Sequence, residues 1–188
     1  MFRNNDEGFT GLEAAIVLIA FVIVAAVFSY VVLGAGFFTT QKSQEVIHTG
    51  IQQASSTLEI VGEVYGTGSR GGPMNAINFS VALAPGGTSV DINESVIVYS
   101  NATELWTLKE TAKGSPAATG HWSILAVQNE KTDDQVLEKG EVFSIMCGIP
   151  GGIYASDAFN VEINPSTGTA LSLHRTAPMS VQAVNIVY

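Results

Sequence analysis

The sequence has 188 residues, of which 46% are hydrophobic and only 13% are charged. Its 17 acidic residues outnumber 8 basic ones, which gives a formal net charge of −9. This balance argues against nucleic-acid binding, because phosphate recognition needs clustered Lys and Arg. The single cysteine, Cys147, excludes an intrachain disulfide and a cysteine-based metal cluster. Its apolar neighbours predict a buried side chain.

Residues 1–8, MFRNNDEG, form a short polar leader with one basic residue, Arg3. A secretory signal would have a basic start, an apolar segment of about 7–15 residues and a small-residue cleavage site behind it. Here the apolar segment is too long, and no clear Ala-x-Ala site follows it. We therefore expect a cut in front of the apolar segment, between Gly8 and Phe9, which leaves that segment on the mature protein.

An uncharged run of 25 residues extends from Ala14 to Phe38, with Ser29 and Tyr30 as its only polar members. A bilayer span needs roughly 20 apolar residues at a rise of 1.5 Å each, so this run is long enough to cross one. A helix that is apolar on all sides needs lipid or other helices around it. Glu13 stands at the edge of the run, where the helix dipole favours a carboxylate.

The helical pattern continues beyond Phe38 with polar residues on one side and an apolar stripe on the other. The stripe is formed by Ile47, Ile51, Ala54, Leu58 and Val61. Glycines and Pro73 follow from Gly66 onward and are typical of a chain break. The sequence therefore predicts one long helix over residues 9–65 and a Gly-rich linker over 66–73. On the polar side, His48 is expected to be a solvated residue and not a metal ligand.

Residues 74–188 consist of short alternating runs separated by turn signals, which is typical of β-strands. The runs cover residues 77–83, 95–100, 104–108, 121–127, 141–146, 159–163, 170–174 and 180–188. The turn signals lie at residues 85–87, 113–116, 138–141, 150–152 and 164–168. About eight short strands predict an antiparallel, Ig-like β-sandwich, so the fold class is α+β. Trp106 and Trp122 are expected to anchor its core.

Catalytic motifs are absent: the sequence has no Walker-type phosphate loop, no GxSxG and no HExxH. We therefore predict no catalytic residue, no metal site and no cofactor. The adjacent carboxylates of Asp133 and Asp134 are expected to lie in a solvated acidic loop. Three Asn-x-Ser/Thr sequons make Asn78, Asn93 and Asn101 candidate N-glycosylation sites, whereas Pro165 excludes Asn164.

The stretch from Gly8 to Ile47 resembles the class III signal peptides of type IV pilin-like subunits. It resembles archaellins, the archaeal flagellins, more closely still. Asp6 and Glu7 stand where such leaders usually carry Lys or Arg. Near the C-terminus, residues 137–145 and 159–178 also look like archaellin sequence. The resemblance covers over a third of the chain and is strongest at the N-terminus.

This resemblance implies a non-enzymatic subunit of the archaeal flagellum, the swimming filament. It implies a precursor held in the membrane by the helix, a prepilin-type peptidase that cuts after Gly8, and a membrane assembly platform. Many copies of the chain would then form a helical filament outside the cell, with the helices in the core and residues 74–188 on the outer surface. The residues expected to form the core are Glu13, Ala14, Ile16, Val17, Ile19, Ala20, Phe21, Val24, Val27, Phe28, Val31, Leu33 and Phe37.

Two alternatives share parts of this pattern. A pilin of an adhesive type IV-like pilus would have the same helix, cleavage and Glu13. A bitopic membrane protein with an external ligand-binding β-sandwich would need no cleavage. The long amphipathic continuation of the helix favours a filament subunit over the second alternative.

Overall fold

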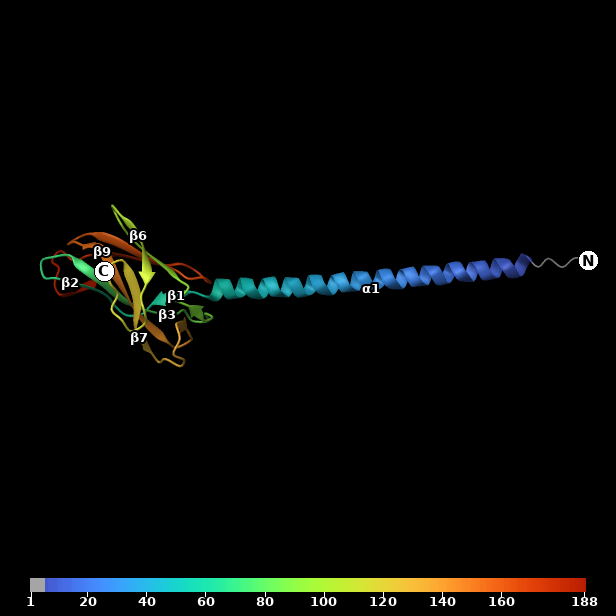
Figure 1. Ribbon diagram of the computed structural model, residues 1–188, viewed down its shortest axis with the longest axis horizontal. Coiled ribbons are helices and arrows are strands. Elements are labelled where there is room, and N and C mark those ends of the chain that lie inside the picture. The colour runs from blue at the N-terminus through green and yellow to red at the C-terminus, as the bar shows by residue number, and fades with distance from the viewer. Residues whose placement is uncertain (1–5) are drawn as a thin grey trace, which may run out of the picture. The chain divides into compact units, whose positions relative to one another are not determined.

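The structure is a computed structural model that describes residues 6–188, with side chains from Gly11 onward (Figure 1). The chain divides into two compact units, one ending at Thr49 and one comprising Gly50–Tyr188. The described part of the first unit belongs to a single helix, and the second unit, hereafter the strand domain, contains every described strand. The expected α+β class, a long apolar helix followed by a mostly antiparallel β-domain, is confirmed.

The helix α1 spans Asp6–Ser55, 50 residues, which corresponds to about 75 Å. It contains no proline, and more than half of its residues are aliphatic or aromatic. Gly34 and Gly36 do not interrupt it. The hydroxyls of Thr39 and Thr40 donate to the carbonyl oxygens of Ala35 and Gly36, at 2.8 and 2.9 Å. These polar side chains are thus satisfied by the helix itself, so the helix continues from its apolar into its polar section.

The predicted helix end at residue 65 is wrong, because α1 ends ten residues earlier. Leu58, expected on the helical stripe, lies in β1 (Leu58–Ile60), where it is 3% exposed and pairs with Leu83. The apolar residues of this segment fit the alternation of a strand as well as the period of a helix. Pairing with the neighbouring strand β3 selects the strand. The predicted linker is wrong for a related reason: β2 spans Val64–Gly68, and residues 69–73 connect it to β3 as a hairpin.

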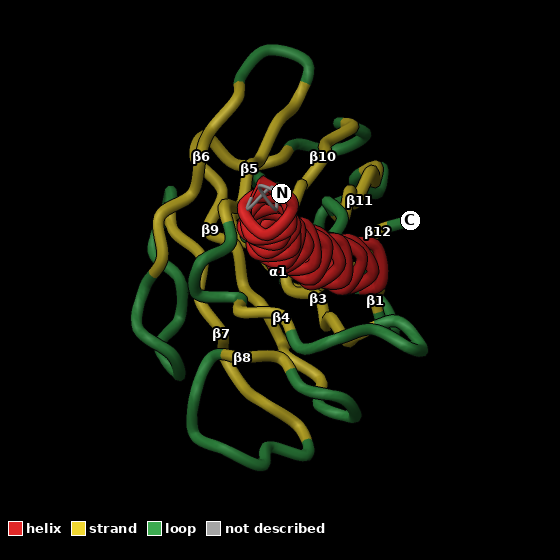
Figure 2. Tube along the Cα trace, turned by 90° about the vertical axis from the view of Figure 1, so that its right-hand side faces the viewer, coloured by secondary structure: helices red, strands yellow, loops and turns green. Residues whose placement is uncertain are grey.

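The strand domain contains one ten-stranded sheet in the order β11-β10-β5-β6-β7-β9-β3-β2-β12, with β1 attached to β3 (Figure 2). A separate two-stranded ladder joins β4 and β8. The remaining strands are β3 (Met74–Leu83), β4 (Val90–Asp91), β5 (Val96–Asn101), β6 (Leu105–Glu110), β7 (His121–Gln128), β8 (Val136–Leu137), β9 (Val142–Ile153), β10 (Ala158–Asn164), β11 (Leu171–Thr176) and β12 (Val184–Val187).

All described strand pairs are antiparallel except β6 and β7, which run parallel over two residue pairs. This short junction joins an antiparallel ladder of β11, β10, β5 and β6 to a second one that begins with β7. Inward side chains of both ladders form one core, for example Tyr99 and Phe159 from the first and Phe79 and Phe143 from the second. The prediction of a sandwich-like β-domain is confirmed, whereas its uniform antiparallel pairing is wrong at β6–β7.

The two tryptophans differ in burial. Trp122 in β7 is 2% exposed and anchors the core as predicted, but Trp106 in β6 is 45% exposed. The cause is the pairing of β6, which contacts β7 only at Lys109 and Glu110, so Trp106 has a strand neighbour on one side alone. The indole N–H of Trp106 donates to Glu104 at 2.9 Å.

The PGG segment at residues 150–152, expected as a turn, lies inside β9. Gly151 and Gly152 have φ of +72° and +71°, values that glycine adopts without steric cost. The register between β9 and β3 shifts beside them, between Met74 and Ala76. This signal therefore marks a β-bulge and not a chain reversal.

The transition from α1 to β1 is held by Ser56, which is fully buried. Its backbone N–H and its hydroxyl both donate to Gln52 O, at 3.0 and 2.8 Å. Its carbonyl oxygen accepts from Thr169 N at 3.0 Å, and its hydroxyl also contacts that of Thr88. Residues from two distant loops thus hold the point where the helix ends.

Gly168 permits the close approach of the Ser56 carbonyl oxygen to this loop. Its φ is +113°, and a Cβ added there would overlap with the carbonyl oxygen of Ser56. We expect Gly168→Ala to lower the free energy of unfolding by about 3 kcal/mol, from backbone strain together with overpacking. The matched control is Gly86→Ala, because Gly86 has a φ of +88° but open space around its Cβ position. In the control, backbone strain alone should lower the free energy of unfolding, by about 1–2 kcal/mol.

The measurement is denaturant unfolding of the full chain in detergent, followed by the fluorescence of buried Trp122. Equal losses in the two variants would contradict the clash with Ser56.

Candidate functional site

The largest feature with no partner in the described chain is the apolar surface of α1. Its large side chains from Leu12 to Phe38 are all more than half exposed, for example Val24 at 65% and Phe28 at 68%. Monomeric soluble proteins rarely expose a continuous apolar surface of this size. The same side chains would be covered in a bilayer or among other helices. By length and composition, α1 is also the one helix in residues 6–188 that is able to cross a membrane.

Shallow grooves along α1 bring several of the predicted core residues together. One groove is lined by Glu13, Ala14, Val17 and Phe21, and it also includes Leu18, Val22 and Ala25. These positions recur every three to four residues, so they share one side of the helix. The carboxylate of Glu13 thus lies at the end of an apolar groove.

A second groove lies further along α1, at Val24, Val27, Phe28 and Val31, with Ile23 as an additional member. The other predicted core residues, Ile16, Ile19, Ala20, Leu33 and Phe37, line neither groove but are exposed on the same helix. The sequence list had omitted Leu18, Val22, Ile23 and Ala25. Since the helix is apolar on all sides, composition identified the segment but could not rank its members.

The predicted cleavage position falls at the start of the helix. The backbones of Gly8 and Phe9 lie in the first turn of α1, whereas residues 1–5 of the leader fall outside the described residues. Phe9 and Glu13 are four residues apart, one helical turn.

The three sequons occupy different environments. Asn78 is half-buried in the middle of β3, paired with Tyr65 on one side and Met146 on the other. Its Oδ1 is buried and accepts no hydrogen bond from any described residue. Asn93 is exposed between β4 and β5, with its amide against the carboxylate of Glu110. Asn101 ends β5, where its Oδ1 accepts from Thr103 N and Glu104 N at 2.9 and 2.7 Å.

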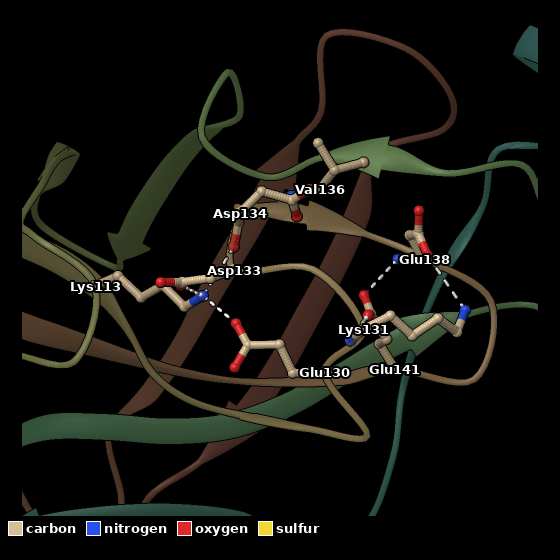
Figure 3. A network of polar contacts seen from close by, with 8 residues as sticks. All are labelled: Lys113, Glu130, Lys131, Asp133, Asp134, Val136, Glu138 and Glu141. Carbon is tan, nitrogen blue, oxygen red and sulfur yellow. Dashed lines mark hydrogen bonds and ion pairs between the residues drawn. The ribbon is translucent and has the colours of Figure 1, made fainter.

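The acidic loop between β7 and β9 is tied down by lysines (Figure 3). Lys113 Nζ forms an ion pair with Glu130, another with Asp133 at 2.9 Å, and donates to Asp134 O at 2.9 Å. The hydrogen bonds that Lys113 donates to Glu130 and Asp133 raise the pKa of Lys113, and Lys113 in turn lowers the pKa of Asp133. The loop therefore carries its own cation, and residues 6–188 contain no cluster of three or more potential metal-ligating side chains.

Glu141 is the buried member of this network, at 2% exposure. Its two carboxylate oxygens accept from the backbone N–H groups of Lys131 and Glu138, both at 2.9 Å (Figure 3). Burial alone would raise the pKa of Glu141, but these two donors and the nearby Lys131 charge outweigh it, so the pKa lies below its usual value. A charged Glu141 thus holds the two ends of the acidic loop together.

Known proteins resemble this chain over nearly its whole length. A family model described as archaeal-type flagellin matches residues 8–175. This chain belongs to the archaeal-type flagellin family. "Probable flagellin 1" of Archaeoglobus fulgidus is 39% identical and aligns over 99% of this chain and 97% of its own length. "Probable flagellin 1" of Aeropyrum pernix is 37% identical over 95% of each chain.

Solved structures agree with this assignment. The archaeal flagellum of Methanospirillum hungatei strain JF1 has a subunit that is 35% identical, with a TM-score of 0.73, covering 95% of this chain and 99% of its own. The crystal structure of flagellin FlaB1 from Methanocaldococcus jannaschii, 14% identical with a TM-score of 0.59, shows a similar fold over 69% of this chain and 95% of its own.

Family membership answers the main functional question. The flagellin is a structural filament subunit of the archaeal flagellum and not an enzyme. It self-assembles into a helical filament that forms an extracellular appendage. The two alternatives, an adhesive pilin and a bitopic binding protein, are thereby disfavoured.

The buried carboxylate of Glu141 generates a pH-dependent prediction. Because its pKa is lowered on folding, its stabilisation is present above its unfolded pKa and is lost as the pH falls through the folded value. Glu141→Gln should cost about 1–3 kcal/mol at neutral pH, since it weakens two charge-assisted hydrogen bonds. The difference from the native chain should shrink below pH 4.5, the usual value for the group.

Denaturant unfolding in detergent, measured from pH 3 to pH 7 (about the range in which carboxylates titrate), checks this expectation. The exposed Glu59 supplies the control variant Glu59→Gln. If Glu141→Gln lowers the free energy of unfolding by the same amount across this pH range, the proposed charge effect is ruled out.

Proposed function

We propose that the apolar section of α1, Ala14–Phe38, forms the core of the filament by packing against the same section of neighbouring subunits. The observation that carries this proposal is the exposure of every large apolar side chain of that section. Burying one such side chain contributes about 1.5–3 kcal/mol. The section holds more than ten of them, so the polymer is strongly favoured over a subunit in water. The strand domain would then form the outer surface.

Before assembly, the same surface would be covered by lipid. The precursor would reside in the membrane through α1, and a prepilin-type peptidase would cut between Gly8 and Phe9. A membrane assembly platform would then transfer the subunit to the filament. The start of the family match at residue 8 supports this junction.

Cleavage would give Glu13 a partner. It creates a free amine on Phe9, one helical turn before the carboxylate, and both groups stand at the positive end of the helix dipole. The amine of the same subunit or of a neighbour could pair with Glu13. An unpaired carboxylate inside an apolar core is costly, which makes such pairing a condition of assembly.

Of the three sequons, Asn93 and Asn101 are the better candidates for glycans. Asn93 lies in the turn between β4 and β5 and Asn101 at the end of β5, where an acceptor sequon is accessible. Asn78 in the middle of β3 is the poorest of the three. Glycopeptide mass spectrometry of native filaments tests each position.

The core proposal predicts that Val24→Asp abolishes filaments, because the new carboxylate would enter the apolar core without a partner. Gln44→Asp adds the same charge to the polar section of the same helix and should still assemble. Both variants are expressed as the sole flagellin, and sheared filaments are examined by electron microscopy together with swimming assays. Normal filaments from Val24→Asp would refute a core built from this section.

The cleavage proposal predicts that the mature protein begins at Phe9. N-terminal sequencing and the intact mass of the native subunit measure this directly. Any mass above that calculated for a chain starting at Phe9 indicates a covalent modification. Glu13→Ala should be cleaved but should assemble poorly, whereas Leu12→Ala next to it should assemble. A native protein that begins at Met1 would remove both the junction and the role of Glu13.

A further inference from the structure

Four neighbouring strands of the strand domain contain no charged residue. They are β9, β3, β2 and β12, which follow one another in the sheet and end at its β12 edge. The strands β5, β7 and β8 are also free of Asp, Glu, Lys and Arg, whereas β1, β4, β6, β10 and β11 each carry at least one. A solvated face of an antiparallel sheet usually alternates apolar with polar or charged residues. In this region the residues that alternate with buried ones are uncharged, for example Asn78 and Ser80 in β3.

The strand register shows which side chains share the outward face of this region. Ile186 pairs with Tyr65, Tyr65 with Asn78, and Asn78 with Met146. Val184 pairs with Thr67 in the next row. Paired residues lie on the same face of a sheet. These six residues, hereafter the neutral face, are Tyr65, Thr67, Asn78, Met146, Val184 and Ile186.

The neutral face is apolar and accessible at its β12 edge. Tyr65 and Ile186 are each 41% exposed and Val184 is 62% exposed, while the alternate residues Val64 and Val187 point into the core at 2%. Among the described strands, β12 pairs with β2 alone, and just after it Tyr188 O accepts a hydrogen bond from Thr176 N at 2.9 Å. Glu63 and Arg70 lie outside β2 at its two ends, and Glu59 of β1, which pairs with Ala82, lies on the same face of the sheet as Asn78.

We propose that the neutral face is a contact surface for the strand domain of a second copy of this flagellin in the filament. Copies of one chain carry the same negative net charge (−9 for the full sequence), so they repel wherever acidic surfaces meet. A region without charge is where two copies approach without this cost, and its apolar side chains gain from burial. An exposed apolar sheet edge is a liability unless something covers it.

The inference depends on filament formation and is separable from the proposed packing of α1. A helical filament uses heterologous contacts, in which one surface of a subunit meets a different surface of the next. The neutral face supplies one of these two surfaces. It adds a contact between outer domains to the contact between helices.

Cysteine protection tests the proposal on complete filaments. Cys147 is fully buried and is the only native cysteine, so the background of thiol labelling is low. Val184→Cys should react with a maleimide in subunits dissociated by detergent and lose that reactivity in intact filaments. The control is Thr132→Cys, which is exposed in the acidic loop and should react in both states.

Labelling of Cys at position 184 in intact filaments, or equal loss of labelling at both positions, would overturn the inference. The first result would not contradict the proposed helical core, because filaments would still have formed. A second variant, Val184→Lys, should lose filaments although the detergent-solubilised chain unfolds at the native denaturant concentration. Val184→Lys filaments in native amount would count against the proposal.

Discussion

The exposed apolar surface of α1 is the constraint on which the rest of the structure depends. A helix of 50 residues with an uncharged run from Ala14 to Phe38 has no stable state alone in water. Lipid and a bundle of identical helices both satisfy it, and neither requires specific chemistry from the partner. The same segment therefore suits both the proposed membrane precursor and the polymer, and the site of this protein is a surface and not a pocket with catalytic groups.

The strand domain has the opposite task, because it must fold by itself and stay soluble. Its core is continuous across both ladders, and its acidic loop forms ion pairs with Lys113 and Lys131. The buried Ser56 and the close approach of Gly168 hold the first residues after the helix. Charge is placed on the loops and on one part of the sheet, and the neutral face is left without it.

The sequence predicted the helix, the eight principal strand segments and the class of protein, since each depends on a pattern longer than one turn. The prediction from sequence failed where one segment fits two structural patterns. Leu58 and Val61 fit a helical stripe, but pairing of β1 with β3 outweighs that preference. The glycines at 151 and 152 read as a turn, and only the register of β9 shows a bulge. Trp106 is exposed because β6 lacks a second neighbour at that point, a property of topology. The neutral face likewise required knowledge of which strands are adjacent.

Cys147 shows how the chain is adapted to travel between compartments. The thiol is fully buried, and burial raises its pKa so that the reactive thiolate is suppressed. Fold stability therefore depends on no disulfide, and the same subunit is equally stable in the reducing cell and in an oxidising medium. Oxidants outside the cell find no accessible thiol to link neighbouring filaments or to stiffen one of them. An oxidising medium therefore does not cross-link subunits of the polymer through cysteine.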